Sequence, residues 1–249
     1  MPSAFLEKNV TFSILLPESR QTGPGPYPVL YLLHPYGGDH LDWIVNTRLE
    51  QAISALPLIV VLPSLENSMA CDTAQGDEFE RFFVDELVAH IETTYSPRVG
   101  PGNTAIAGVD TGGYAALRLS LAYPYWFGVA ASLSGDVCAA NEERLVELPG
   151  GAETARRYPR VFGPSTDSRR KGVDLFQLAE SAVKNGPPMV YLDCGGDDLL
   201  AQHNRDFRKQ LATVRVRHEF KEQPGGHDWG YWDSRLAEML TFIERSLGL

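Results

Sequence analysis

The sequence predicts a single α/β domain over residues 1–249, with a doubly wound, mostly parallel sheet and helices on both faces. Two observations support this prediction. Short apolar runs, typical of strands covered on both faces, alternate along the chain with longer amphipathic segments, typical of helices. The composition, with 43% hydrophobic and 22% charged residues, is that of a globular protein with a substantial core.

The first hundred residues are expected to supply three strands and two helices. Residues 9–16 alternate as an edge strand does, whereas residues 29–33 and 58–62 are continuously apolar, as buried strands are. Residues 47–55 predict one helix, and the apolar stripe within 77–94 predicts a second.

The rest of the chain continues the alternation around one irregular stretch. Strands are expected at 104–109, 127–133, 188–193 and 214–221, and helices after residue 110, at 199–211 and at 231–247. Residues 137–186 are rich in charge, Pro and Gly, so no large cap domain is expected there. That stretch predicts one short helix at 175–183, with Arg169-Arg170-Lys171 in a solvated loop.

Charge and cysteine content narrow the classes of partner. The net charge of −10 disfavours nucleic acid and anionic membrane surfaces, and no stretch approaches the ~20 apolar residues of a membrane span. Cys71, Cys138 and Cys194 are odd in number and widely spaced, which favours a reducing cytoplasm over a disulfide framework. Apart from Asp193, Asp197 and Asp198, no cluster of residues has the spacing of metal ligands, so a metal site is not expected. No organic cofactor is implied.

The segment Gly108-Val-Asp110-Thr-Gly112-Gly113 joins the predicted strand at 104–109 to a helix with small first residues. In such a strand–turn–helix, Gly-x-Ser-x-Gly forms a nucleophile elbow, where a strained turn lifts the central side chain clear of the sheet. Here the central residue is Asp110 instead of serine. The pattern therefore predicts an acyl-transfer type of site with a carboxylate where a hydroxyl is expected.

Three further loops carry groups that acyl-transfer chemistry requires. They are His34-Pro-Tyr-Gly-Gly, Cys194-Gly-Gly-Asp-Asp-Leu-Leu and Pro224-Gly-Gly-His-Asp-Trp, in the chain order that places a nucleophile before an acid and a histidine. With the elbow, these motifs resemble the esterase D family, which includes S-formylglutathione hydrolases, over residues 5–246. The resemblance implies the α/β-hydrolase fold.

Carried over position by position, the resemblance implies that Asp198 orients the imidazole of His227 and that His227 carries the proton. Asp197 is the main competitor for the acid role, and Asp136 is a more distant one. The backbone N–H groups of Tyr36 and Thr111 are implied as the oxyanion hole.

Aromatic and histidine side chains near these loops are candidates for contacts with a small-molecule or small-peptide substrate. His34, Trp43 and Trp229 are predicted to bind substrate, and Tyr36 and Trp232 could also pack against it. For Trp43 and Trp232, a place in the hydrophobic core is the favoured alternative.

A carboxylate at position 110 changes what the site can do. Serine needs a histidine to accept its proton, whereas an aspartate is already ionised. Two carboxylates beside His227 should also favour its protonated form. Ordinary serine-type hydrolysis is therefore broken or altered.

Three functions fit this change. The first choice is an acid/base epimerase or isomerase that acts next to a carbonyl, similar to the atypical group that includes the peptide epimerase of the bottromycin pathway. The second is a hydrolase with Asp110 as nucleophile, of the dehalogenase or epoxide hydrolase type. The third is an inactivated esterase that binds small molecules.

Overall fold

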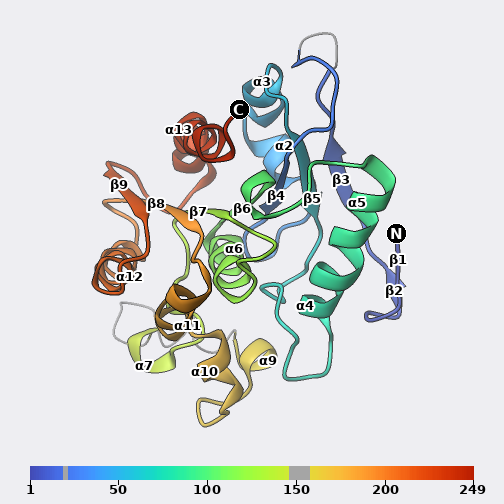
Figure 1. Ribbon diagram of the computed structural model, residues 1–249. Helices are drawn as coiled ribbons and strands as arrows, with labels where there is room; N and C mark the ends of the chain where they lie inside the picture. Colours follow the sequence, from blue (N-terminus) through green and yellow to red (C-terminus); the bar gives the residue numbers. More distant parts are fainter. Residues whose placement is uncertain (19–21, 146–157) are drawn as a thin grey trace.

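The computed structural model describes residues 1–18, 22–145 and 158–249. Seven strands form the main sheet in the order β3-β5-β4-β6-β7-β8-β9, with β3 antiparallel to β5 and the other pairs parallel. This arrangement confirms the predicted doubly wound, mostly parallel sheet of the α/β-hydrolase fold (Figure 1). A separate pair of two-residue strands, β1 and β2, is antiparallel.

The strands are β1 (Pro2–Ser3), β2 (Lys8–Asn9), β3 (Phe12–Leu15), β4 (Val29–Leu33), β5 (Ile59–Pro63), β6 (Thr104–Val109), β7 (Val129–Leu133), β8 (Met189–Gly195) and β9 (His218–Gln223). The helices are α2 (Asp42–Asn46), α3 (Leu49–Ile53), α4 (Phe79–Arg81), the π-helix η1 (Phe82–Leu87), α5 (Val88–Tyr95), the 3₁₀-helix η2 (Pro101–Asn103), α6 (Asp110–Ala122), α7 (Glu142–Leu145), α9 (Pro159–Phe162), α10 (Arg169–Val173), α11 (Leu175–Ala182), the 3₁₀-helix η3 (Val183–Asn185), α12 (Ala201–Thr213) and α13 (Trp229–Leu247).

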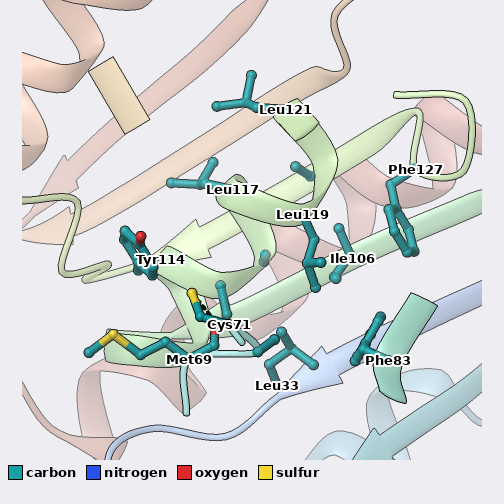
Figure 2. Packing of buried hydrophobic residues seen from close by; sticks show 14 of the residues in the cluster. Leu33, Met69, Cys71, Phe83, Ile106, Tyr114, Leu117, Leu119, Leu121 and Phe127 are labelled. Carbon is teal, nitrogen blue, oxygen red and sulfur yellow. Dashed lines mark hydrogen bonds between the residues drawn. The ribbon is translucent and has the colours of Figure 1, made fainter. Parts of the chain in front are cut away.

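Side chains alternate between the two faces of the sheet, because successive residues of a strand point to opposite sides. In β4, Tyr31 and Leu33 join a core with residues of η1, α5, α6, α11 and α12, whereas Leu30 and Leu32 join a core with α2, α3 and α13. Figure 2 shows the first core, with Leu33 and Ile106 of the sheet against Leu117 and Leu119 of α6. Helices therefore cover both faces, as the continuously apolar strands predict.

Several predicted elements differ in detail from the observed ones. The edge strand expected at 9–16 is two shorter strands, β2 and β3, and the helix expected at 77–94 contains the π-helical turn η1. The strand expected from residue 214 begins only at His218, because Arg215 has the left-handed φ of +63° in the turn that follows α12.

The irregular stretch between β7 and β8 contains only short helices among its described residues. Its helix α11 agrees with the prediction at 175–183. The prediction of a solvated loop at Arg169-Arg170-Lys171 is wrong, because these residues open α10 and Arg170 is buried. The Arg170 guanidinium donates to the carbonyl oxygens of Gly163 and Pro164, so it fastens the turn between α9 and α10.

No helix in the described parts of the chain is both long and apolar enough to cross a membrane.

Candidate active site

Asp110 stands at the junction of β6 and α6 in a strained backbone conformation. Its φ is +52°, a left-handed value that is uncommon for a residue with a side chain. The turn closes because Gly108 and Gly112 lack side chains: a Cβ on Gly108 would lie 2.4 Å from the backbone of Gly112, and one on Gly112 would lie 2.4 Å from the His34 carbonyl oxygen. The strand–turn–helix thus has the geometry of a nucleophile elbow with Asp110 at its apex.

The imidazole of His227 lies between two carboxylates. Its Nδ1 is 3.0 Å from Asp198 Oδ2, and its Nε2 is 3.4 Å from Asp110 Oδ1. The Asp198 side chain is fully buried after β8, whereas Asp197 is exposed. The structure therefore brings Asp110, His227 and Asp198 together in one row and leaves Asp197 outside it.

The second oxygen of Asp110 occupies a backbone donor. Asp110 Oδ2 accepts a hydrogen bond of 2.9 Å from the Tyr36 N–H, one of the two groups expected to form an oxyanion hole. The loop that carries Tyr36 is held by Gly38, whose N–H donates to the Pro35 carbonyl oxygen. Thr111, the other expected donor, follows Asp110 in the first turn of α6 and is buried. The Tyr36 N–H, expected to bind an oxyanion, is therefore already bonded to a carboxylate oxygen of Asp110.

The two carboxylates determine the charge of His227. Burial alone would lower the pKa of His227, but hydrogen bonds to Asp110 and Asp198 and the charges of both groups raise that pKa from 6.5 to about 10. Burial opposes ionisation of Asp198, yet the hydrogen bond from His227 lowers the pKa of that carboxyl. At neutral pH, His227 is therefore an imidazolium held between two carboxylates.

Asp136 places a third carboxyl group in this region, after β7. Its side chain is buried, and its Oδ2 accepts a hydrogen bond of 2.5 Å from the Tyr158 hydroxyl. Burial raises the pKa of Asp136 to about 7; the Tyr158 hydrogen bond opposes this rise, and the charge of Asp110 adds to it. Asp136 therefore contacts Tyr158, not His227, and the acid position next to the imidazole belongs to Asp198.

A cavity of about 520 Å³ opens over these groups. Its lining combines carboxylates, aromatic rings and a few apolar side chains: Pro35, Tyr36, Asp110, Asp136, Tyr158, Leu199, Leu200, His227, Asp228, Trp229 and Trp232. Sequence reasoning missed Leu199, Leu200 and Asp228, which lie beside predicted site residues, and Tyr158, which comes from the irregular stretch. Nothing local in the sequence indicates that Tyr158 reaches this cavity.

Two of the three residues predicted to bind substrate lie elsewhere. His34 is buried, with Nδ1 2.8 Å from the Pro35 carbonyl oxygen and Nε2 accepting from the Leu65 N–H, so it holds the loop together. Trp43 is also buried, and its indole N–H donates to the Leu33 carbonyl oxygen. Trp229 lines the cavity, and its ring packs edge-on against Trp43 and Trp232; its contact with substrate stays a prediction.

The model of the Esterase family ("Putative esterase") matches residues 3–243. The chain belongs to this family. An acetyl esterase of Caldicellulosiruptor saccharolyticus is 29% identical over 98% of this chain and 96% of its own length. The diacylglycerol acyltransferase/mycolyltransferase Ag85A of Mycobacterium tuberculosis is 26% identical over 92% of this chain and 76% of its own.

Solved structures of similar proteins share the fold across the whole esterase domain. The serine hydrolase FphF of Staphylococcus aureus has a TM-score of 0.85 at 23% identity and covers 98% of this chain and 95% of its own. The S-formylglutathione hydrolase FrmB of the same organism has a TM-score of 0.82 at 23% identity and covers 98% and 96%. These likenesses confirm the α/β-hydrolase fold that the motifs predict.

Proposed function

We propose that this esterase-family chain is a hydrolase that uses the Asp110 carboxylate as its nucleophile. The substrate carries a leaving group on a saturated carbon. The Asp110 carboxylate attacks that carbon to form an ester, which the same site then hydrolyses. The acetyl esterase among its relatives is named for hydrolysis, which favours this function over the epimerase that was the first choice from the sequence.

One hydrogen bond carries the proposal, the bond from the Tyr36 N–H to Asp110 Oδ2. An acyl substrate needs that donor for its own carbonyl oxygen, but here Asp110 already occupies it. Once Asp110 is esterified, the same N–H instead stabilises the oxyanion that forms when water attacks the Asp110 ester. The geometry therefore suits hydrolysis of an Asp110 ester better than attack on a substrate ester.

The proposed cycle begins with bond formation between Asp110 Oδ1 and the substrate carbon, while the bond to the leaving group breaks and the leaving group takes the electron pair. Esterification removes one of the two negative charges beside His227, so its pKa falls and it releases its proton. The neutral imidazole is then able to act as a base.

Water then transfers a proton to His227 Nε2, and its oxygen bonds to Asp110 Cγ. The ester bond at Oδ1 breaks, and the product alcohol departs with the proton from His227. The new carboxylic acid of Asp110 returns its own proton to His227, which restores the starting ion pair. The sum is substrate plus water giving an alcohol and the protonated leaving group.

Trapping of the ester intermediate tests this proposal. We expect His227→Gln to form the Asp110 ester without hydrolysing it, because the base is missing. The variant is incubated with styrene oxide and with 1-bromohexane, and intact mass followed by peptide mapping locates the adduct. The control is the double variant with His227→Gln and Asp110→Asn, which also lacks the base but has no carboxylate at position 110.

An adduct on Asp110 that is absent from the control supports the proposal. The absence of an adduct, together with exchange of the α-proton of a peptide in heavy water by the native protein, would favour the epimerase instead. If Asp110→Ser hydrolyses p-nitrophenyl acetate while the native protein neither forms an adduct nor exchanges protons, the chain is an inactivated esterase.

A further inference from the structure

Asp136 has an unused hydrogen-bonding position inside the cavity wall. The residue is 1% exposed and lines the cavity. Tyr158 donates to Oδ2, whereas Oδ1 has no hydrogen-bond partner among the described residues. A buried carboxylate oxygen without a donor carries a large desolvation cost, so such an oxygen needs an explanation.

The backbone around Asp136 fixes this carboxyl group in place. Its own N–H donates to the Asp110 carbonyl oxygen at 3.1 Å, and the Ser134 N–H donates to the Asp193 carbonyl oxygen at 2.7 Å. The Asn204 side chain donates to the Gly135 carbonyl oxygen at 2.9 Å. These bonds hold the backbone of the loop, and the Tyr158 hydroxyl holds the Asp136 carboxyl group at the cavity.

Negative charge in the cavity exceeds positive charge. Asp110, Asp136 and Asp228 line it, and none of its described lining residues is Lys or Arg. His227, the cationic group among the described lining residues, already lies between Asp110 and Asp198. The pKa of Asp136, which burial raises to about 7, has the direction expected of a carboxyl group that lacks a cationic partner.

Aromatic rings form much of the remaining wall. Tyr36, Tyr158, Trp229 and Trp232 line the cavity, and Trp232 packs edge-on against both Trp229 and His227. The faces of Trp and Tyr rings attract cations, and the attraction grows when water is excluded. Carboxylates and aromatic rings thus favour the same kind of ligand.

We propose that the cavity binds substrates that carry a protonated amine, whose N–H donates to Asp136 Oδ1 while the aromatic wall contacts the adjoining carbon atoms. This inference rests on the proposed function, since it names the substrate class of the same site. A cation at this position would supply the donor that Oδ1 lacks and offset the excess of carboxylates.

Calorimetric titration with three ligands of similar shape tests the proposal. The probes are 2-phenylethylammonium, 2-phenylethanol and 3-phenylpropionate, each added to the native protein at pH 7.5. A hydrogen bond to a charged group contributes ~1.5–3 kcal/mol, so the ammonium should bind at least ~10-fold more tightly than the alcohol. The carboxylate should bind most weakly.

Asp136→Asn is the informative variant, because the amide oxygen still accepts from Tyr158 while the charge is lost. The preference for ammonium over alcohol should fall to ~3-fold or less. Asp85→Asn is the matched control, since Asp85 is exposed on η1 and outside the cavity lining; it should keep the native preference. Thermal unfolding verifies that both variants are folded, and if Asp136→Asn is not, the native ligand series decides alone.

Equal binding of ammonium and alcohol by the native protein would overturn the proposal, as would an unchanged preference in folded Asp136→Asn. A preference for the carboxylate ligand would also overturn the proposal. Arginine side chains favour such a ligand, and Arg156 and Arg157 precede Tyr158 in the sequence, outside the described residues. Binding requires no turnover. Ammonium selectivity without an Asp110 adduct would therefore contradict the hydrolase alone, and an adduct without selectivity would contradict this inference alone.

Discussion

Asp193, inside β8, and the carboxylates at the cavity have opposite surroundings. Asp193 in β8 accepts from the hydroxyls of Tyr191 and Tyr231 and from Arg235 Nε at 2.8 Å. At the cavity, Asp110 and Asp198 share one imidazolium, and an oxygen of Asp136 has no described partner. A carboxylate whose oxygens accept from several donors, such as Asp193, holds the fold together, whereas Asp110 and Asp136 line the cavity with fewer donors and can interact with a ligand.

The largest expected difference concerns activity. Asp110→Asn removes the nucleophilic charge while it keeps the size of the side chain and an acceptor for the Tyr36 N–H. Loss of a nucleophile costs several powers of ten in rate, so we expect turnover to fall by ~10⁴-fold or more. Steady-state kinetics on a substrate captured by His227→Gln measures this, and a fall of less than 10-fold would show that Asp110 is not the nucleophile.

For Asp193 we expect a loss of stability instead. Asp193→Ala leaves the Arg235 guanidinium without its buried partner, and breaking such a pair costs ~3–5 kcal/mol. Urea unfolding monitored by tryptophan fluorescence gives the free energy of unfolding, with Asp206→Ala as the control, because Asp206 is a partly exposed residue of α12 whose ion pair with Lys209 lies at the surface. If Asp193→Ala is as stable as the control, the distinction between the two groups fails.

The pH response of His227 sharpens the comparison further. Its pKa in the fold, about 10, lies above the ordinary 6.5, so its protonation stabilises the folded state. This contribution is complete below about pH 6.5 and is lost as pH rises through about 10.

Asp110→Asn should lower the His227 pKa by at least ~1 unit, equivalent to ~1.4 kcal/mol, because one of two anionic partners is gone. Imidazole proton shifts followed by NMR between pH 5 and pH 11 measure this change. A native His227 that titrates near 6.5 would contradict the arrangement of charges described above.

The smallest effect is expected at Trp43, which lies behind the cavity wall. Trp43→Phe removes the hydrogen bond to the Leu33 carbonyl oxygen and some ring volume, at a cost of ~1–2 kcal/mol of stability. Ligand affinity should remain within ~3-fold of the native value, because Trp43 does not line the cavity. Trp229→Phe, which changes a lining residue, is the matched comparison and should weaken binding of 2-phenylethylammonium more.

Motifs and apolar runs predicted the framework well, for physical reasons. Strands such as β4 and β6 are buried on both faces, so they are continuously apolar in the sequence. The elbow requires glycine at Gly108 and Gly112, because a Cβ at either position would lie 2.4 Å from backbone atoms. Such local requirements are visible in the sequence, whereas Asp198 and His227 were assigned from the resemblance of the four motifs to the esterase D family.

Contacts between distant segments were not predictable in the same way. His34 and Trp43 occur beside a site loop, but their orientation depends on which face of the sheet they pack against, and both turn into the interior. Tyr158 enters the cavity from an irregular stretch without periodicity. The burial of Arg170 likewise depends on carbonyl oxygens of a turn that the sequence does not reveal.

Oxygen labelling is the most direct test of the central claim that Asp110 forms and releases an ester. The native protein is allowed many turnovers in H₂¹⁸O with a substrate that His227→Gln captures, and the peptide containing Asp110 is then weighed. Because water attacks Asp110 Cγ, the account predicts that ¹⁸O enters the Asp110 carboxylate only when substrate is present. Turnover that leaves Asp110 unlabelled would contradict it.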